Sequence, residues 1–233
     1  MASLDQALTK QALAKGKVRR ITNDLAVGLR IRYIGTSTVT TVAATQATSL
    51  VFTTAAVTDT YLFSGYSTLG ALCDKINAEG RWEAKVMDAL RSENPDDFFV
   101  TNADITATTD ENGEPCYDLA IDTDAAATFS CVLSPADNFD APEGHRVSLI
   151  EIDYLVNNTA AFDTLSIVKR IISTGQEVVI YAATNTDNSA ASLTFASGNG
   201  KITAGWDEEL VVYFDGTVVN AADGYIQCIG IYE

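Results

Sequence analysis

His145 is the residue best suited to acid–base or nucleophilic catalysis, because it is the only histidine of the 233-residue chain. A serine or cysteine nucleophile needs a histidine base beside it, and a GxSxG turn would position such a serine. The chain contains no GxSxG sequence, and His145 follows Gly144 in a polar stretch typical of a loop. We therefore expect His145 to be a structural or solvated side chain, and we expect no enzymatic activity.

Neighbouring acidic residues are the second kind of candidate, because two facing carboxylates can cleave a glycosidic bond. Asp122 and Asp124 form one such pair, and Asp207, Glu208 and Glu209 form a second group. The chain has 31 acidic residues, so such groups arise by chance, and these lie at the ends of expected strands. We interpret them as solvated turn residues. Hydrolysis of a surface polysaccharide is the alternative, and it requires two carboxylates across a groove.

Two glycine-containing turns have some features of ligand-binding loops. Gly198-Asn-Gly-Lys201 lacks the longer glycine-to-lysine spacing and the following Ser or Thr of a phosphate-binding loop, so we expect a hairpin turn. Asp110-Glu-Asn-Gly113 offers oxygen ligands for calcium, but it lacks their regular spacing and the distal glutamate. Its Asn-Gly pair predicts a β-hairpin instead, because both residues tolerate positive φ.

The cysteines are too widely separated for a zinc site and include no CxxC pair. They are Cys73, Cys116, Cys131 and Cys228. We expect reduced core residues in a protein made in the cytosol, and no cofactor. The chain has neither the pattern of a secretory signal nor an apolar run of membrane-spanning length, so no membrane association is expected.

The clearest local pattern lies at residues 66–87, where a helix is followed at once by a strand. Leu69, Leu72 and Ile76 recur at helical spacing, and Gly80 can end the helix. From Trp82 onward, apolar and charged residues alternate, as in a half-buried strand. The helix presents apolar side chains to a core, so we interpret it as the brace of a first domain.

Turn residues and alternating apolar residues divide the rest of the chain into strands. The predicted fold is mainly β with a small α+β module. Strands are expected around the helix at 25–34, 38–43, 48–54, 61–63, 98–101, 105–109, 115–122 and 128–133. Further strands at 150–156, 165–172, 176–183, 191–195, 210–214 and 225–232 predict an antiparallel, jelly-roll-like β-sandwich. The expected organisation is a basic N-terminal arm and first strand (1–32), an α+β domain (33–133), a linker (134–144) and the sandwich (145–233).

The charge distribution is uneven along the chain. Residues 1–32 carry seven basic and two acidic side chains, whereas the remainder carries eight basic and twenty-nine acidic ones. A positive arm on a strongly negative body favours docking of the arm on an acidic protein partner. Nucleic acid is not expected as the partner, since the negative body would be repelled by phosphates. A helix with a solvated basic face is the alternative interpretation. The candidate partner-binding residues are Lys10, Lys15, Lys17, Arg19, Arg20, Arg30 and Arg32.

Two of the expected sandwich strands are apolar on both faces, which indicates either a central position or a surface covered by another subunit. The candidate oligomer-interface residues are Val211, Tyr213, Ile229 and Ile231. They predict a homo-oligomer formed through the sandwich, such as a trimer.

The helix and strand at residues 66–87 resemble the "Ile-Asn" module of flagellar hook-associated proteins and many tailed-phage virion proteins. The matching residues are Leu69, Leu72, Ile76, Asn77 and Gly80. In those families their role is structural, with apolar anchors on the helix and the asparagine and glycine turning the corner. The chain lacks the long terminal heptad helices of flagellar proteins, so it looks more like a bacteriophage virion component.

This resemblance implies a non-enzymatic structural protein of the virion, made in the host cytoplasm. The leading hypothesis is a capsid decoration or cement subunit that binds capsid, neck or tail proteins through its arm. The alternative is a carbohydrate-binding or adhesion module of a tail, spike or cell surface. Trp206 and Tyr225 are the aromatic residues that would stack on a sugar, and burial of Trp206 would remove the anchor of that hypothesis.

Overall fold

The chain folds into two compact units in the computed structural model. Unit 1 comprises Met1–Asn23 and Ser130–Glu233, and unit 2 comprises Asp24–Phe129. The structure describes residues 17–22, 26–96, 98–110, 113–122, 131–133, 146–155, 164–184, 191–195, 202–215 and 225–232. Within this described part the fold is mainly β, with several antiparallel sheets and one α-helix, which confirms the predicted fold class.

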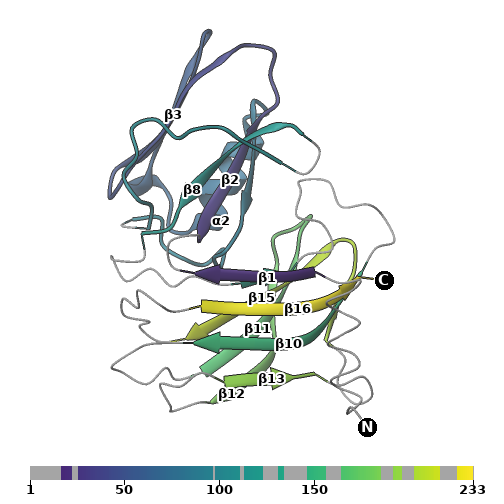
Figure 1. The fold of residues 1–233 in the computed structure, drawn as a ribbon. Helices are drawn as coiled ribbons and strands as arrows, with labels where there is room; N and C mark the ends of the chain where they lie inside the picture. Colours follow the sequence, from purple (N-terminus) through teal and green to yellow (C-terminus); the bar gives the residue numbers. More distant parts are fainter. Residues whose placement is uncertain are drawn as a thin grey trace. The chain divides into compact units, whose positions relative to one another are not determined.

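Unit 1 is an antiparallel β-sandwich of two sheets. The first has the strand order β1-β16-β10-β13, with β14 also paired to β10, and the second has the order β12-β11-β15-β9. Figure 1 shows β1, β16, β10 and β13 side by side in that order. The strands are β1 (Lys17–Thr22), β9 (Cys131–Leu133), β10 (Val147–Leu155), β11 (Thr164–Ile171), β12 (Glu177–Thr184), β13 (Ala191–Thr194), β14 (Thr203–Ala204), β15 (Glu208–Asp215) and β16 (Tyr225–Tyr232).

The strand order of unit 1 is that of a jelly roll. When the short β14 is set aside and the remaining strands are counted along the chain, the sheets have the orders 1-8-3-6 and 2-7-4-5. These orders are those of two interlocked Greek keys. Between the sheets lie fully buried side chains from both, including Ile152 and Cys228 of one sheet and Ile167 and Val212 of the other. The predicted jelly-roll-like sandwich is therefore the architecture of unit 1.

Unit 2 is inserted into the first connection of this jelly roll, between β1 and β9. These boundaries differ from the predicted ones for three segments. The last part of the predicted arm is β1, a strand of the sandwich, and residues 131–133 belong to the sandwich as β9. The first strand of the prediction, at 25–34, belongs to unit 2. The predicted linker at 134–144 and the predicted helix before Gly16 lie outside the described residues.

Unit 2 contains two small sheets and the helix. One sheet has the order β6-β2-β8-β7, and the other is the meander β3-β4-β5. Helix α2 packs against β6 and buries Leu69, Leu72, Cys73 and Ile76. The elements are β2 (Val27–Tyr33), β3 (Val39–Thr45), β4 (Ser49–Thr54), β5 (Thr58–Leu62), the 3-10 turn η2 (Phe63–Gly65), α2 (Leu69–Ala78), β6 (Trp82–Val86), β7 (Thr108–Thr109) and β8 (Pro115–Ala120).

The corner between α2 and β6 is fixed by side-chain hydrogen bonds to the backbone. Thr68 caps the helix by accepting from the N–H of Ala71 at 3.1 Å, and Gly80 ends it with a φ of +69°. The amide of Asn77 pairs with both backbone groups of Ala84, donating to its carbonyl at 3.0 Å and accepting from its N–H at 2.7 Å. The predicted role of Asn77 and Gly80 in turning this corner is confirmed.

Trp82 joins the two sheets of unit 2 in one core. Its ring is fully buried and packs 4.8 Å from the ring of Tyr33 and 5.0 Å from that of Phe52. Its Nε1 donates to the buried carboxylate of Asp59 at 3.0 Å, and the guanidinium of Arg81 pairs with the same carboxylate. The polar end of the indole is therefore satisfied inside the core, as burial of tryptophan requires.

The predicted strands at 98–101 and 105–109 are largely absent from the described structure. Phe98 and Phe99 are both buried, at 2% and 0% exposure, and their rings pack edge-on 5.2 Å apart. Phe99 forms only an isolated bridge with Ile121, and the second strand is reduced to β7. Two backbone hydrogen bonds flank the Phe99–Ile121 bridge, from the N–H of Val100 to the carbonyl of Ala120 at 3.1 Å and from the N–H of Asp122 to the carbonyl of Phe98 at 2.8 Å.

Substitutions that break β1 test whether this segment is part of the sandwich. In R19P/R20P one new proline occupies a position whose N–H faces β16, because neighbouring residues of a strand point their N–H groups in opposite directions. We expect a loss of about 3 kcal/mol or more and faster hydrogen exchange in β16 and β10, while α2 keeps its protection. The control R19A/R20A removes the same charges and keeps the ladder. Equal protection of β16 in both variants would contradict the assignment.

Candidate functional site

Arg30 and Arg32, two of the predicted partner-binding residues, are held in ion pairs within unit 2. Arg30 donates to Asp118 through Nε at 2.6 Å and through Nη2 at 2.8 Å. Arg32 donates from Nε to Glu83 at 2.9 Å, and its Nη1 lies 3.6 Å from the buried carboxylate of Asp110. The hydrogen bonds to Asp118 outweigh burial and raise the pKa of Arg30. These arginines are therefore committed to cross-strand pairs on the polar face of β2.

The other five basic candidates belong to unit 1. Lys10 and Lys15 lie outside the described residues. Lys17, Arg19 and Arg20 belong to β1, whose backbone pairs with β16. The structure therefore separates the predicted basic set into five residues of one unit and two of the other.

Two of the four predicted oligomer-interface residues are buried within the chain. Val211 and Ile229 are 0% and 4% exposed, and Tyr213 is only partly exposed. Ile231 lies on β16, close to its end. The apolar run of β15 is buried on both faces, because the consecutive residues Leu210, Val211 and Val212 are all at 0% exposure. Central burial, the first of the two interpretations, therefore accounts for this strand, and Val211 and Ile229 are corrected to core residues.

The exposed large apolar side chains of the described residues lie elsewhere. They are Ile34, Val57, Leu62, Val100, Val178, Val179, Ile180 and Trp206. Three of them are consecutive on β12, and Trp206 stands alone in the turn between β14 and β15.

Trp206 is 47% exposed and sits on a turn that is anchored to the neighbouring β11–β12 turn. The carboxylate of Asp207 accepts from the N–H of Ser173 at 2.9 Å and from its hydroxyl at 2.6 Å. The carbonyl of Asp207 accepts from the N–H of Ile172 at 2.9 Å. Three hydrogen bonds thus hold the residue next to the indole, which presents an aromatic ring on a preorganised support.

Glu208 anchors the other side of the Trp206 turn. Its Oε2 accepts from the backbone N–H of Gly205 at 2.8 Å and from Nζ of Lys169 at 3.0 Å. Partial burial alone would raise the pKa of Glu208, but these hydrogen bonds outweigh it and lower the pKa below its usual value. The carboxylate is therefore charged at neutral pH and stabilises the turn.

Arg170 connects three strands of the second sheet through a buried ion-pair network. Its Nη1 donates to Glu209 of β15 at 2.8 Å, and its Nε donates to Glu177 of β12 at 2.8 Å. Arg170 and Glu209 are 3% and 1% exposed, so loss of either partner would leave a charge in the core. The sequence does not reveal this network, because it depends on the cross-strand register.

The acidic groups considered for hydrolysis do not converge on one site. Asp207, Glu208 and Glu209 each bind different partners, and Glu209 is buried, so its interpretation as a solvated turn residue was wrong. Asp122 accepts from Nε2 of Gln46 at 2.6 Å, and Asp124 lies outside the described residues.

The predicted hairpin at Asp110 is confirmed by the pairing of β7 with β8. The carboxylate of Asp110 accepts from the N–H of Glu114 at 2.9 Å and faces Arg32. Gly113, in the turn, has a φ of +83°. These contacts use the Asp110 carboxylate as a structural group of the turn. No cluster of three or more potential metal ligands occurs within the part of the chain that the structure describes.

All four cysteines are buried thiols, as predicted. His145 and the turn at 198–201 lie outside the described residues, as does the side chain of Tyr225. None of the helices within the described ranges has the length and apolar character needed to cross a bilayer.

No protein-family model matches the chain, and comparison with curated proteins returned no match.

Replacing Glu208 by glutamine tests the anchoring of the Trp206 turn. At pH 7 we expect E208Q to lower the free energy of unfolding of unit 1 by about 1 kcal/mol, because an ion pair and a charge-assisted hydrogen bond are weakened. The folded-state pKa of Glu208 lies below the unfolded value of about 4.3. The contribution is therefore complete above that pH and is lost as the pH falls through the lower folded-state value.

Hydrogen exchange of the segment 202–215, measured at neutral and acidic pH, checks this expectation. The difference between wild type and E208Q should shrink in acid. E114Q, a substitution at an exposed glutamate of unit 2, is the control and should leave this segment unchanged. A difference that persists undiminished in acid would show that the carboxylate charge is not its source.

Proposed function

We propose that this chain is a non-enzymatic structural protein of a tailed-phage virion, most specifically a capsid decoration or cement subunit. The observation that carries the proposal is the jelly-roll topology of unit 1, an architecture common in viral capsid proteins and lectins. A fold by itself does not assign a function, so the proposal also rests on the charge distribution and on the helix-strand module of unit 2.

The corner between α2 and β6 supports the resemblance to virion proteins. Asn77 pairs with the backbone of Ala84 and Gly80 adopts positive φ, so both residues of the motif have the structural role that the resemblance implies. In this proposal unit 2 is a structural insertion on the sandwich.

Attachment in this proposal uses the basic residues near the N-terminus. Since Arg30 and Arg32 are neutralised within unit 2, the set is reduced to Lys10, Lys15 and the three basic residues of β1. The partner is an acidic surface of a capsid, neck or tail protein, and the chain acts on the virion after synthesis in the host cytoplasm.

Self-association through the sandwich is the second part of the proposal. A decoration protein binds a particle more tightly when several weak contacts act together. Because Val211 and Ile229 are buried within the chain, the contact between copies must use another surface of unit 1.

Charge reversal near the N-terminus tests attachment. K10E/K15E should bind particles that lack the protein at least tenfold more weakly than wild type, and the wild-type affinity should fall with added salt. The substitutions leave β1 intact, whereas deletion of residues 1–24 would also remove a strand of the sandwich.

Cosedimentation with purified particles measures this binding. The control K75E/K85E makes the same change in net charge on unit 2 and should bind as wild type does. Equal binding by K10E/K15E and wild type would refute attachment through these lysines.

Carbohydrate binding is the second candidate function, favoured by the exposure of Trp206 on an anchored turn. A planar aromatic ring held in solvent is a suitable platform for the apolar face of a sugar, and lectin domains share the jelly-roll architecture. A tail, spike or cell-surface adhesion module would use such a platform.

Substitution of Trp206 tests the carbohydrate hypothesis. We expect W206A to weaken binding on a glycan array by about tenfold, which corresponds to about 1.4 kcal/mol, and W206F to retain part of the binding. V100A alters an exposed valine of unit 2 and serves as the control. An array on which wild type and W206A give the same signals would remove this function.

A further inference from the structure

Strand β12 is an edge strand with an unusual surface. It ends the order β12-β11-β15-β9, and within the described residues it pairs only with β11. Val178, Val179 and Ile180 are 48%, 54% and 41% exposed. Val178 and Val179 are consecutive residues in regular register with Lys169 and Val168, so they point to opposite faces and β12 exposes apolar side chains on both sides of the sheet. A run of three exposed apolar residues is an error in a solvated surface unless it has a function.

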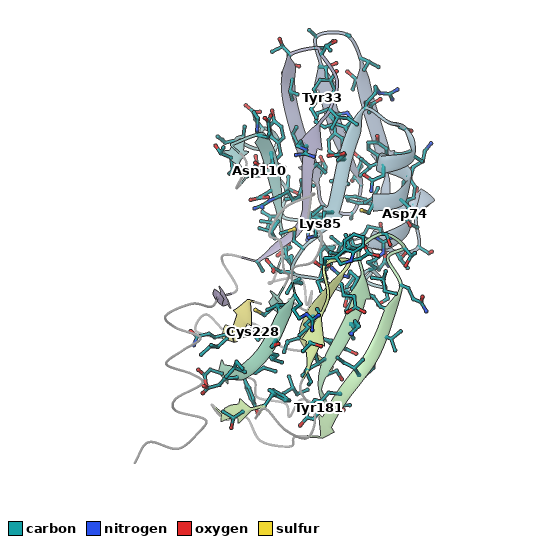
Figure 2. All side chains as sticks on the ribbon, turned by 90° about the vertical axis from the view of Figure 1, so that its right-hand side faces the viewer. Tyr33, Asp74, Lys85, Asp110, Tyr181 and Cys228 are labelled. Atoms are coloured by element: carbon teal, nitrogen blue, oxygen red, sulfur yellow. The ribbon has the colours of Figure 1, made fainter. Side chains whose placement is uncertain are left out.

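The exposed run is a formed part of the sheet. On its N-terminal side, the β11–β12 hairpin is closed by hydrogen bonds from Ile171 N–H to the Gln176 carbonyl at 2.8 Å and from Gly175 N–H to the Ile171 carbonyl at 2.7 Å. On its C-terminal side, the ring of Tyr181 packs edge-on against Phe195 at 5.5 Å. Figure 2 labels Tyr181 on this strand. Contacts on both sides therefore fix the exposed run in the sheet.

Protection by charged residues or proline is missing from most of this edge strand. Natural proteins place lysine, proline or inward-facing charges on exposed edges to prevent pairing between molecules. Residues 178–184 contain no charged residue and no proline. The single charge of β12 belongs to Glu177, and Arg170 pairs with it at 2.8 Å. The one irregularity in the pairing with β11 is a register shift between Ile167 and Val168, which leaves Ile180 without a partner on β11 as a bulge of β12, a device that can also blunt an edge.

We propose that β12 pairs antiparallel with β12 of a second copy across a two-fold axis, which joins two four-stranded sheets into one of eight strands. This inference rests on the self-association in the proposed function and names its surface. A two-fold contact uses the same patch on both copies, so it must be self-complementary. An uncharged strand that is apolar on both faces meets that requirement.

Electrostatics favours a second copy at this edge in particular. The chain has a net charge of -16, so most contacts between copies would place acidic residues against acidic residues. In a register centred on Val179, Val178 of one copy lies opposite Ile180 of the other, and Glu177 lies opposite Tyr181. No like charges face each other, and the backbone groups of both edges are hydrogen-bonded.

Sedimentation equilibrium from micromolar to millimolar concentration tests the proposal with full-length protein. Wild type should approach the mass of a dimer, whereas V179K places two ammonium groups at the centre of the contact and should weaken association at least tenfold. V57K introduces the same charge at an exposed valine of unit 2 and should dimerise as wild type does. Circular dichroism and thermal melting check that V179K is folded.

A cysteine at the two-fold axis gives a second, positive test. In V179C the new thiols of two copies would lie opposite each other, so mild oxidation should produce a covalent dimer. The native cysteines are buried and should not contribute, and V57C is the matched control.

The outcomes separate this inference from the proposed function. The β12 contact would be overturned if wild type formed a trimer. It would also be overturned if V179K remained oligomeric and V179C did not cross-link. Self-association itself would stand in both cases. A wild-type monomer at all concentrations would overturn both, while attachment through Lys10 and Lys15 is tested separately on particles. A third outcome is a wild-type monomer combined with loss of particle binding in V179K. That result would show that β12 pairs with a strand of another protein, and it would also overturn the second copy as the partner of this edge.

Discussion

The pairing of β1 with β16 is the constraint on which the rest of the architecture depends. Six residues from Lys17 to Thr22 form a ladder with the end of the chain, opposite residues 225–230. Sheet formation therefore joins segments separated by about the whole sequence. Unit 2 is an excursion within the first connection, because the chain must return to β9 to continue the jelly roll. Chain entropy is lost when such distant segments are brought together, before their contacts stabilise the sheet. Folding of unit 1 is therefore expected to be slow relative to that of α2 and β6.

Local features were predictable from the sequence and long-range pairing was not. Helix α2, the corner at Gly80 and the Asn-Gly hairpin depend on residues within a few positions of each other. The number and spacing of turns sufficed for the jelly-roll-like class. The sequence of β1, Lys-Val-Arg-Arg-Ile-Thr, has two apolar residues three positions apart and so lacks the alternation of a strand. Its strand conformation comes from β16, a partner that local patterns cannot reveal.

Whether an apolar run lies in the core or at the surface depends on its position in the sheet, which the sequence does not show. Residues 210–212 and 178–180 are both runs of branched apolar side chains in strands of the same sheet. The first run is fully buried and the second is about half exposed, because β15 lies between two strands whereas β12 lies at the edge. The polar face of β2 shows the same limit. Its two arginines were correctly placed, but their partners Asp118 and Glu83 follow from register alone.

The ion pairs of the second sheet connect the two candidate surfaces of unit 1. Arg170 links β12 to β15, and Asp207, beside Trp206, binds Ser173 in the turn that leads into β12. The aromatic platform and the apolar edge therefore belong to one rigid group of strands. A two-fold contact at β12 would place two Trp206 turns in a fixed relation to each other. Paired platforms would bind a repetitive glycan surface more tightly than either alone, since the second contact becomes intramolecular. A structural role and a carbohydrate-binding role would thus be compatible in this fold, and the proposed β12 contact would set the valency.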